Sequence, residues 1–137
     1  MIKYMIDTDM SIYTIKRKPH EVRRMFNINA GLMAISTITL GELLFGAENS
    51  RNRVKNLSLV NGFANRLEIL DYDQAAAAQF GQLRCELKGN EIGAYDTMIA
   101  AHARSRGLVL VTNNLKEFER VDGLRIESWV TDSLNIN

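Results

Sequence analysis

Short apolar segments alternate along this chain with longer segments in which apolar residues recur every three or four positions. Runs of four to six mostly apolar residues predict β-strands, and continuous runs are typical of strands that are covered on both faces. We therefore expect strands at residues 2–6, 32–35, 67–70, 108–111 and 124–130.

The segments between these strands predict helices, because their apolar residues fall on one side of a helix. Ser36 or Thr37 is suited to begin the third helix. Asp73 is suited to cap the fifth, and Gly89 and Gly107 are suited to end the last two. The expected helices cover residues 9–17, 21–26, 36–48, 53–66, 74–88 and 93–106, with a break at Lys18–Pro19 between the first two.

Strands that alternate with helices of this length predict βαβ units with right-handed crossovers. The expected fold is therefore an α/β three-layer sandwich, with a parallel sheet of about five strands flanked by helices. In such sheets ligands bind beyond the carboxyl ends of the strands. The chemistry of the chain should be sought at that edge.

The amino-acid composition limits the class of protein but does not identify its function. The 137 residues, 46% hydrophobic and 24% charged, are expected to form a single domain over residues 1–137. One cysteine, Cys85, excludes an internal disulfide, and we expect it in the core, whereas His102 is expected on a helix surface or in the core. The lack of a membrane-spanning run or signal pattern favours the cytoplasm.

Four acidic residues occupy positions where a charge is costly. Asp7 closes the first strand, Glu42 is embedded in an apolar helix, and Asp96 lies in the first turn of another. Glu117 follows the fourth strand. Each has an ordinary explanation: Asp7 or the nearby Asp9 as a helix cap, Asp96 as a partner of the helix dipole, Glu42 at the edge of its apolar stripe, and Glu117 in solvent.

Together these acids predict a metal site. The topology brings them to the carboxyl edge of one sheet, where several carboxylates cannot all ionise unless a cation offsets their repulsion. Oxygen ligands select a hard ion such as Mg²⁺ or Mn²⁺. The chemistry typical of such a cluster is metal-assisted attack of water on a phosphorus atom.

Two other classes also fit part of the pattern. An aspartate-nucleophile phosphatase of the haloacid dehalogenase type would use Asp7 as nucleophile and Asp9 as acid, with Ser36 binding phosphate. It would leave Glu42 without a role and lacks paired acids after the fourth strand. A receiver-like signalling domain would use Asp71 as phosphate acceptor, but no lysine is well placed at the end of the last strand.

Three segments resemble a known family. MIKYMIDTDMSIYTIK (1–16), ISTITLGELLFGAENS (35–50) and the long segment from IGAYDTMIAAHA to GLRIESW (92–129) are similar to VapC-type toxins of toxin–antitoxin pairs, which are PIN-domain ribonucleases. The resemblance implies strand order 3-2-1-4-5 and a site that holds Mg²⁺ or Mn²⁺. It implies metal ligation by Asp7, Glu42 and Asp96, a catalytic role for Glu117, and supporting roles for Thr8, Asp9, Thr112, Asn113 and Asn114.

The resemblance also implies a function and partners. Such toxins are metal-dependent endoribonucleases that cut structured RNA, most often tRNA in the anticodon stem-loop, and so inhibit translation. TIKRKP and LDYDQAAAAQFGQLRCEL favour the subgroup associated with initiator tRNA. A VapB-type antitoxin is the expected partner, with a homodimer and a larger assembly on operator DNA. A PIN scaffold that only binds RNA or represses transcription is an alternative, which retention of the acids disfavours.

An RNA-cleaving protein needs a surface for the phosphate backbone. Two basic runs are candidates, although either could be a solvated face. Tyr95, beside Asp96, could stack on a base or be partly buried. The first run contains Lys16, Arg17, Lys18, Arg23 and Arg24, and the second contains Arg51, Arg53 and Lys55.

Overall fold

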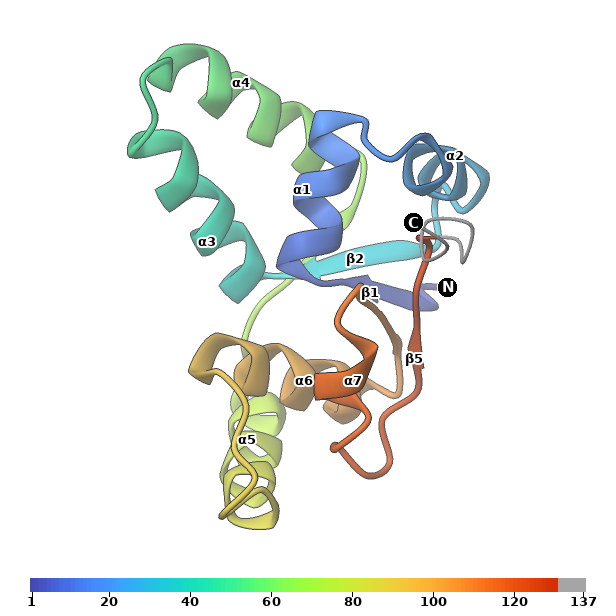
Figure 1. The fold of residues 1–137 in the computed structure, drawn as a ribbon, viewed down its shortest axis with the longest axis vertical. Helices are drawn as coiled ribbons and strands as arrows, with labels where there is room; N and C mark the ends of the chain where they lie inside the picture. The colour runs from blue at the N-terminus through green and yellow to red at the C-terminus, as the bar shows by residue number, and fades with distance from the viewer. Residues whose placement is uncertain (131–137) are drawn as a thin grey trace.

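A parallel sheet forms the centre of the molecule (Figure 1). The computed structural model describes residues 1–130, so the expected domain end at residue 137 lies outside the described residues. The sheet has the order β3-β2-β1-β4-β5, and each neighbouring pair is parallel, which confirms the expected fold class and strand order. The strands are β1 (Tyr4–Ile6), β2 (Met33–Ser36), β3 (Glu68–Leu70), β4 (Val109–Val111) and β5 (Ile126–Glu127).

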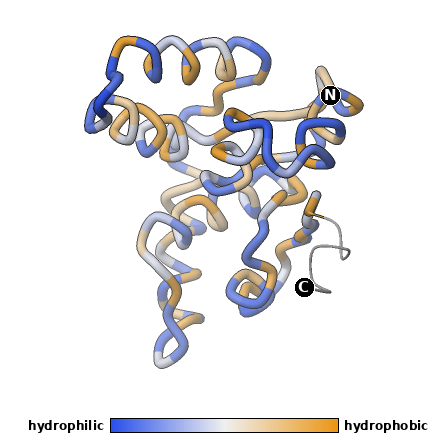
Figure 2. Tube along the Cα trace, turned by 45° about the horizontal axis from the view of Figure 1, so that its top comes forward, coloured by the Kyte–Doolittle hydropathy of each residue, from blue (hydrophilic) through white to orange (hydrophobic). Residues whose placement is uncertain are grey.

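Helices cover both faces of the sheet and complete the three layers. In Figure 1 the first four helices lie above the sheet and the last three lie below it. Figure 2 shows hydrophobic and hydrophilic residues interspersed along the helices. The helices are α1 (Thr8–Lys16), α2 (His20–Ile28), α3 (Thr37–Glu48), α4 (Arg53–Ala64), α5 (Gln74–Glu86), α6 (Ala94–Arg106) and α7 (Leu115–Phe118).

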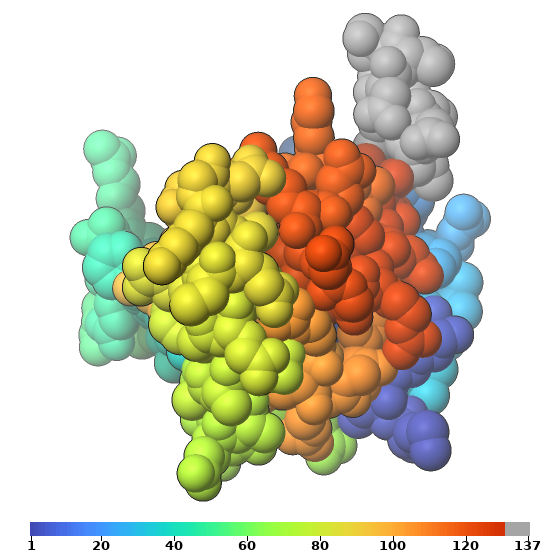
Figure 3. Space-filling view, turned by 90° about the horizontal axis from the view of Figure 1, so that it is seen from below, coloured from blue at the N-terminus to red at the C-terminus, as the bar shows by residue number. Residues whose placement is uncertain are grey.

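Two apolar cores result from the alternation of side chains along the strands. Tyr4 and Ile6 of β1 pack into the core beneath α1–α4, whereas Met5 packs into the core that α5 and α6 cover. Figure 3 shows the molecule from below, on the side of the helices that follow β3. The visible surface there includes α5, the loop after it and the segment that follows β4. No helix within residues 1–130 is both long enough and apolar enough to cross a membrane.

Local side-chain hydrogen bonds begin four of the helices, α1, α3, α4 and α5. Asp7, Ser36 and Asp73 accept hydrogen bonds from the amides of Met10 (2.8 Å), Ile38 (3.1 Å) and Ala76 (2.9 Å). Ser36 and Asp73 were expected in these roles. Asp7 has both its ordinary role as a cap and, as described below, a place among the acids.

Several details differ from the sequence predictions. The loop after β4 contains the short helix α7, and β5 is shorter than residues 124–130 because the Ser128 hydroxyl bonds the Val130 amide and turns the chain. Cys85 is exposed, because α5 turns Leu83 and Leu87 rather than Cys85 toward the core. His102 is fully buried, as a core residue.

Candidate active site

Asp7 lies at the middle of the carboxyl edge of the sheet. Its side chain is 3% exposed, and its amide donates to the Val111 carbonyl of β4 at 3.0 Å. Burial raises its pKa to about 7, against hydrogen bonds from Thr112 and the Met10 amide that lower it, and the charges of Asp9 and Glu42 add to the rise. Asp7 is therefore a carboxyl group that ionises only at the expense of folding free energy or with help from a positive charge.

Glu42 of α3 reaches the same edge through a contact with α1. The Thr8 hydroxyl donates to Glu42 Oε1 at 2.6 Å, and Thr8 Oγ1 also lies 3.2 Å from Thr39 Oγ1. Thr8 follows Asp7 directly, so this hydrogen bond ties the position of Glu42 to the end of β1. The half-buried glutamate that looked misplaced in an apolar helix faces this edge rather than the core.

Asp96 and Glu117 form a second pair of acids. Burial is the main cause that raises the pKa of Asp96 to about 7, followed by its contact with the carboxyl group of Glu117. The charges of Asp7 and Asp9 raise the pKa further, which brings the exposed Asp9 into the same electrostatic group. Among the residues described, Glu117 Oε1 is buried and has no hydrogen-bond partner.

The chemistry of the donor set, rather than its present geometry, fits a hard divalent cation. The group consists of carboxylates, two of them with pKa values raised to about 7, and it holds an orphaned buried oxygen. A cation would offset the repulsion among these carboxylates. Within residues 1–130 no three acidic, histidine or cysteine side chains converge on one point.

The polar residues predicted to support the acids have different surroundings. Thr112 is fully buried, bonds Asp7 and accepts from the Asn114 amide at 3.0 Å. Asn113 is exposed and donates to the Tyr13 hydroxyl at 3.3 Å. The Asn114 side chain is exposed and makes no capping hydrogen bond to α7.

The basic residues differ in their distance from the acids, since Lys16 lines the same cavity as Glu42, whereas Arg17 lies at the far end of α1 from Asp7. Helix α1 begins at its cap Asp7 and ends at Arg17, and ten residues at 1.5 Å each separate them by about 15 Å. Tyr95, by contrast, is 57% exposed and lies directly beside Asp96. Lys16, Lys18 and Arg24 are exposed, as are Arg51, Lys55 and Arg53, which pairs with Glu48.

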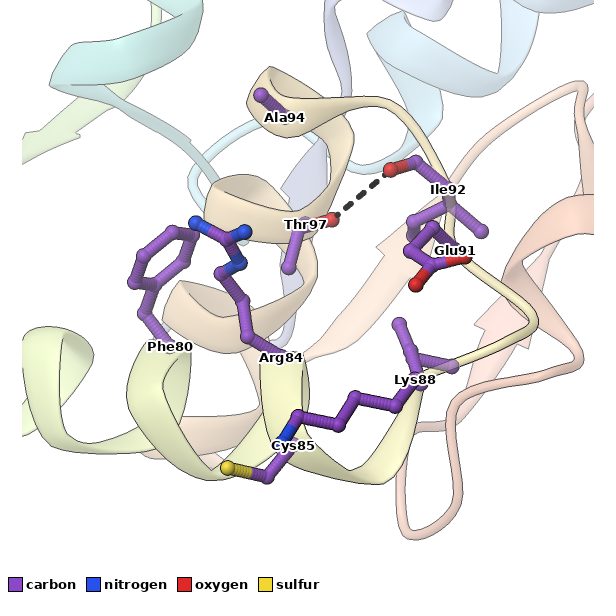
Figure 4. A pocket seen from close by; sticks show the side chains of 9 residues that line it. Phe80, Arg84, Cys85, Lys88, Glu91, Ile92, Ala94 and Thr97 are labelled. Carbon is purple, nitrogen blue, oxygen red and sulfur yellow. Dashed lines mark hydrogen bonds between the residues drawn. The ribbon is translucent and has the colours of Figure 1, made fainter.

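A cavity of about 580 Å³ between α5 and α6 does not belong to this group of acids (Figure 4). Its lining holds the exposed Cys85 and the Phe80 and Arg84 side chains of α5. The Thr97 hydroxyl, which Figure 4 shows directed to the Ile92 carbonyl, also bonds the Gly93 carbonyl at 2.8 Å. Only Glu91 supplies a carboxylate there, so the chemistry belongs to the sheet edge.

Sequence reasoning expected Thr8 to support the acids without saying which one, and it missed Arg66. The contact of Thr8 with Glu42 joins residues 34 positions apart and depends on how α1 packs on α3. Arg66, beyond the end of α4, shares a cavity with Arg17 and Arg23, although neither basic run included it. Neither contribution has a local signal, because both arise from helix packing.

Comparison with known proteins adds a family to this geometry. The PIN domain profile matches residues 4–124. The chain is 55% identical to the tRNA(fMet)-specific endonuclease VapC of Shigella flexneri, over 94% of this chain and 99% of that protein, and 57% identical to its counterpart from Salmonella typhimurium over the same shares. The crystal structure of DNA-bound VapBC from Salmonella typhimurium matches with a TM-score of 0.91 at 57% identity, over 95% of this chain and all of that chain.

A second solved structure agrees. VapBC2 from Rickettsia felis, bound to a DNA fragment from its promoter, matches with a TM-score of 0.88 at 39% identity and covers 95% of this chain and all of that chain. The matched profile spans β1 to the segment before β5, and therefore includes Asp7, Glu42, Asp96 and Glu117. The chain belongs to the PIN-domain family and, within it, to the VapC ribonucleases.

Proposed function

We propose that this chain is the toxin of a toxin–antitoxin pair, and that it cleaves initiator tRNA in the anticodon stem-loop and so inhibits translation. The observation that carries the proposal is near-complete similarity, at 55% and 57% identity, to two relatives named tRNA(fMet)-specific endonucleases. The acids at the sheet edge support a phosphodiester hydrolysis. Its place of action would be the cytoplasm, where the tRNA is.

We propose that Asp7, Glu42 and Asp96 hold Mg²⁺, or Mn²⁺ in its place. PIN-domain nucleases generally use divalent metal ions, and the oxygen donor set at this edge suits either one. When bound, such an ion activates a water molecule and offsets negative charge on the phosphodiester.

The protein residues have separate roles in this proposal. The Met10 amide and Thr112 fix the orientation of Asp7, and Thr8 fixes that of Glu42. Glu117 is assigned to proton transfer, since its buried Oε1 is free of hydrogen bonds to the described residues. Asp9, Asn113 and Asn114 would adjust the charge and polarity of the site mouth.

We propose a VapB-type antitoxin as partner, with a homodimer that forms a larger assembly with it on operator DNA. The two solved relatives are VapBC proteins bound to DNA. A cavity of about 350 Å³ between α1, α3 and α4 is lined by apolar residues such as Ile12 and Val60, with Glu42 among its lining. It suits an apolar antitoxin segment that carries a basic residue toward the acids.

The phosphatase alternative is not favoured. Its phosphate-binding candidate, Ser36, is fully buried, bonds the Ile38 amide and lies 2.8 Å from His102 Nδ1. That serine is therefore committed to structure. The receiver alternative requires Asp71, which follows the partly exposed edge strand β3.

The substrate proposal is tested with purified protein and two transcripts. In Mg²⁺ we expect initiator tRNA to be cut at one position in the anticodon stem-loop, and the elongator methionine tRNA to be cut much more slowly. EDTA should abolish cleavage, and Mn²⁺ should restore it. Cleavage that survives EDTA would contradict the metal assignment, and release of phosphate from an aryl phosphate would instead favour the phosphatase.

A conservative change at Thr8 tests the orientation of Glu42. Thr8→Val keeps the shape of the side chain but removes the hydroxyl that donates to Glu42. A hydrogen bond to a charged group is worth about 1.5–3 kcal/mol, so kcat should fall about 10- to 100-fold with little change in KM. Thr8→Ser should restore most of kcat; a Val variant as active as the wild type would refute the role.

A further inference from the structure

Three arginines from separate parts of the chain surround one small cavity. Arg17 ends α1, Arg23 lies in α2, and Arg66 follows α4 by two residues. The cavity has a volume of about 190 Å³, and the buried Phe26 and Phe63 form its floor. In Figure 1 these helices lie together above the sheet, on the side opposite α5 and α6.

Two of the guanidinium groups are held in place by neutral partners. Arg23 Nη1 donates to the Thr14 carbonyl at 3.0 Å, and Arg66 Nη2 donates to Asn27 Oδ1 at 2.9 Å. The Arg66 guanidinium also lies over the Phe26 ring at 4.6 Å, a cation–π contact. These contacts orient the two side chains through groups that carry no negative charge.

The three arginines lie close enough to repel one another. Ion pairs elsewhere in the described residues join Arg53 to Glu48 and Arg104 to Glu86. Burial, together with the charges of Arg17 and Arg66, lowers the pKa of Arg23. An anion among the three guanidinium groups would relieve the repulsion between them. Arg17 also adopts a left-handed backbone conformation (φ 60°), which is usual for Gly or Asn at a helix end.

A phosphate of RNA fits the arrangement better than an isolated anion. A second cavity of about 440 Å³ shares Arg23 and continues along α2 past Arg24, with His20 and Glu21 also in its lining. The exposed Lys16 and Lys18 flank Arg17. Positive groups that follow one another over the surface suit a polyanion with regularly spaced charges, and planar guanidinium groups suit phosphate oxygens.

We propose that Arg17, Arg23 and Arg66 form a phosphate-binding site that holds the RNA backbone several nucleotides from the cleaved bond. The inference rests on the proposed function, in which the chain cleaves RNA at the acidic edge. Helix α1 places the arginine site about 15 Å from Asp7 at that edge. The site would fix the position of a folded RNA on the surface rather than take part in bond cleavage.

Arginine-to-glutamine variants test the proposal through binding and its salt dependence. In EDTA, which prevents cleavage, Arg23→Gln and Arg66→Gln should each raise the Kd for initiator tRNA about 10-fold or more. The slope of log K against log salt should become shallower by about 1 for each variant. In Mg²⁺ the KM should rise while kcat stays the same.

The matched control is Arg84→Gln. Arg84 is exposed on α5, on the other face of the sheet, and lies over Phe80 much as Arg66 lies over Phe26. Its Kd and salt slope should stay at the wild-type values. If a glutamine variant fails to fold, Arg23→Lys and Arg66→Lys retain the charge, and these should weaken binding several-fold with an unchanged slope.

The binding and cleavage results distinguish a failure of the phosphate-site inference from a failure of the proposed function. Unchanged Kd and salt slope in both glutamine variants would overturn the phosphate site, as would a loss confined to antitoxin binding, which would assign the arginines to an acidic protein segment. If the wild type binds and cuts tRNA while the variants match it, only this inference fails. If the wild type cuts no RNA, the proposed function fails instead.

Discussion

Asp96→Asn is expected to slow single-turnover cleavage of tRNA by about 10³-fold or more at saturating Mg²⁺, with the fold unchanged. The carboxyl group of Asp96 lies against that of Glu117 and within the field of Asp7 and Asp9. An amide of the same shape supplies no negative charge to a cation. Losing one carboxylate should therefore remove several kcal/mol of transition-state stabilisation, and each 1.36 kcal/mol is a factor of ten.

The control for this experiment is Asp71→Asn. Asp71 is exposed and follows β3 at the edge of the sheet, so it tests the same chemical change outside the acidic group. Its activity should equal that of the wild type. An Asp96→Asn protein that cleaves tRNA at the wild-type rate would show that this residue does not serve the metal, whereas inactivity of Asp71→Asn would show that the loss of activity is not specific to the acidic group.

The fold was predictable because its signals are local. Apolar runs at β1, β2 and β4 occupy strands buried on both faces, and capping residues such as Ser36 and Asp73 begin helices where expected. The edge strand β5 was overestimated, since its apolar alternation continues past the point where Ser128 turns the chain. Alternation predicts a partly buried strand but does not say how far the ladder extends.

The candidate site was predictable only in part. Asp7 could be assigned to the carboxyl edge because it directly follows a buried strand, and the order of the βαβ units brings the other acids to the same side. The geometry of side chains from separate helices has no such local signal. The contact between Thr8 and Glu42, and the meeting of Arg66 with Arg17 and Arg23, depend on how the helices pack.

Asp7 also shows why the ordinary and the functional interpretation of a residue need not compete. Its carboxylate caps α1 through the Met10 amide, and the same group lies buried among acids at the sheet edge. The cap fixes the side chain with one oxygen and with backbone geometry that asparagine can reproduce. Capping does not require the negative charge, because an amide would cap equally well. Burying that charge lowers the stability of the fold, so we infer that the charge serves the reaction.

That reasoning predicts that Asp7→Asn stabilises the protein in the absence of metal. Because the pKa of Asp7 rises to about 7 in the folded state, the folded protein retains a proton that the unfolded chain has lost above about pH 4. The free energy of unfolding should therefore fall as the pH rises through this window. Asparagine does not ionise, so in EDTA the variant should be more stable than the wild type by about 2–4 kcal/mol at pH 8.

Urea unfolding in EDTA at pH 5 and pH 8 measures the effect. At pH 5 the gap should shrink to about 1 kcal/mol, because Asp7 of the wild type is then protonated in the folded state, while the unfolded chain has already lost most of this proton. Asp7→Ala separates the charge from the cap, since it removes both and should lose about 1 kcal/mol relative to Asp7→Asn at either pH. Saturating Mg²⁺ should narrow the gap at pH 8 by stabilising only the wild type. A difference between wild type and Asp7→Asn that is the same at both pH values would mean that the Asp7 carboxylate carries no burial cost, and that no cation is needed to hold it there.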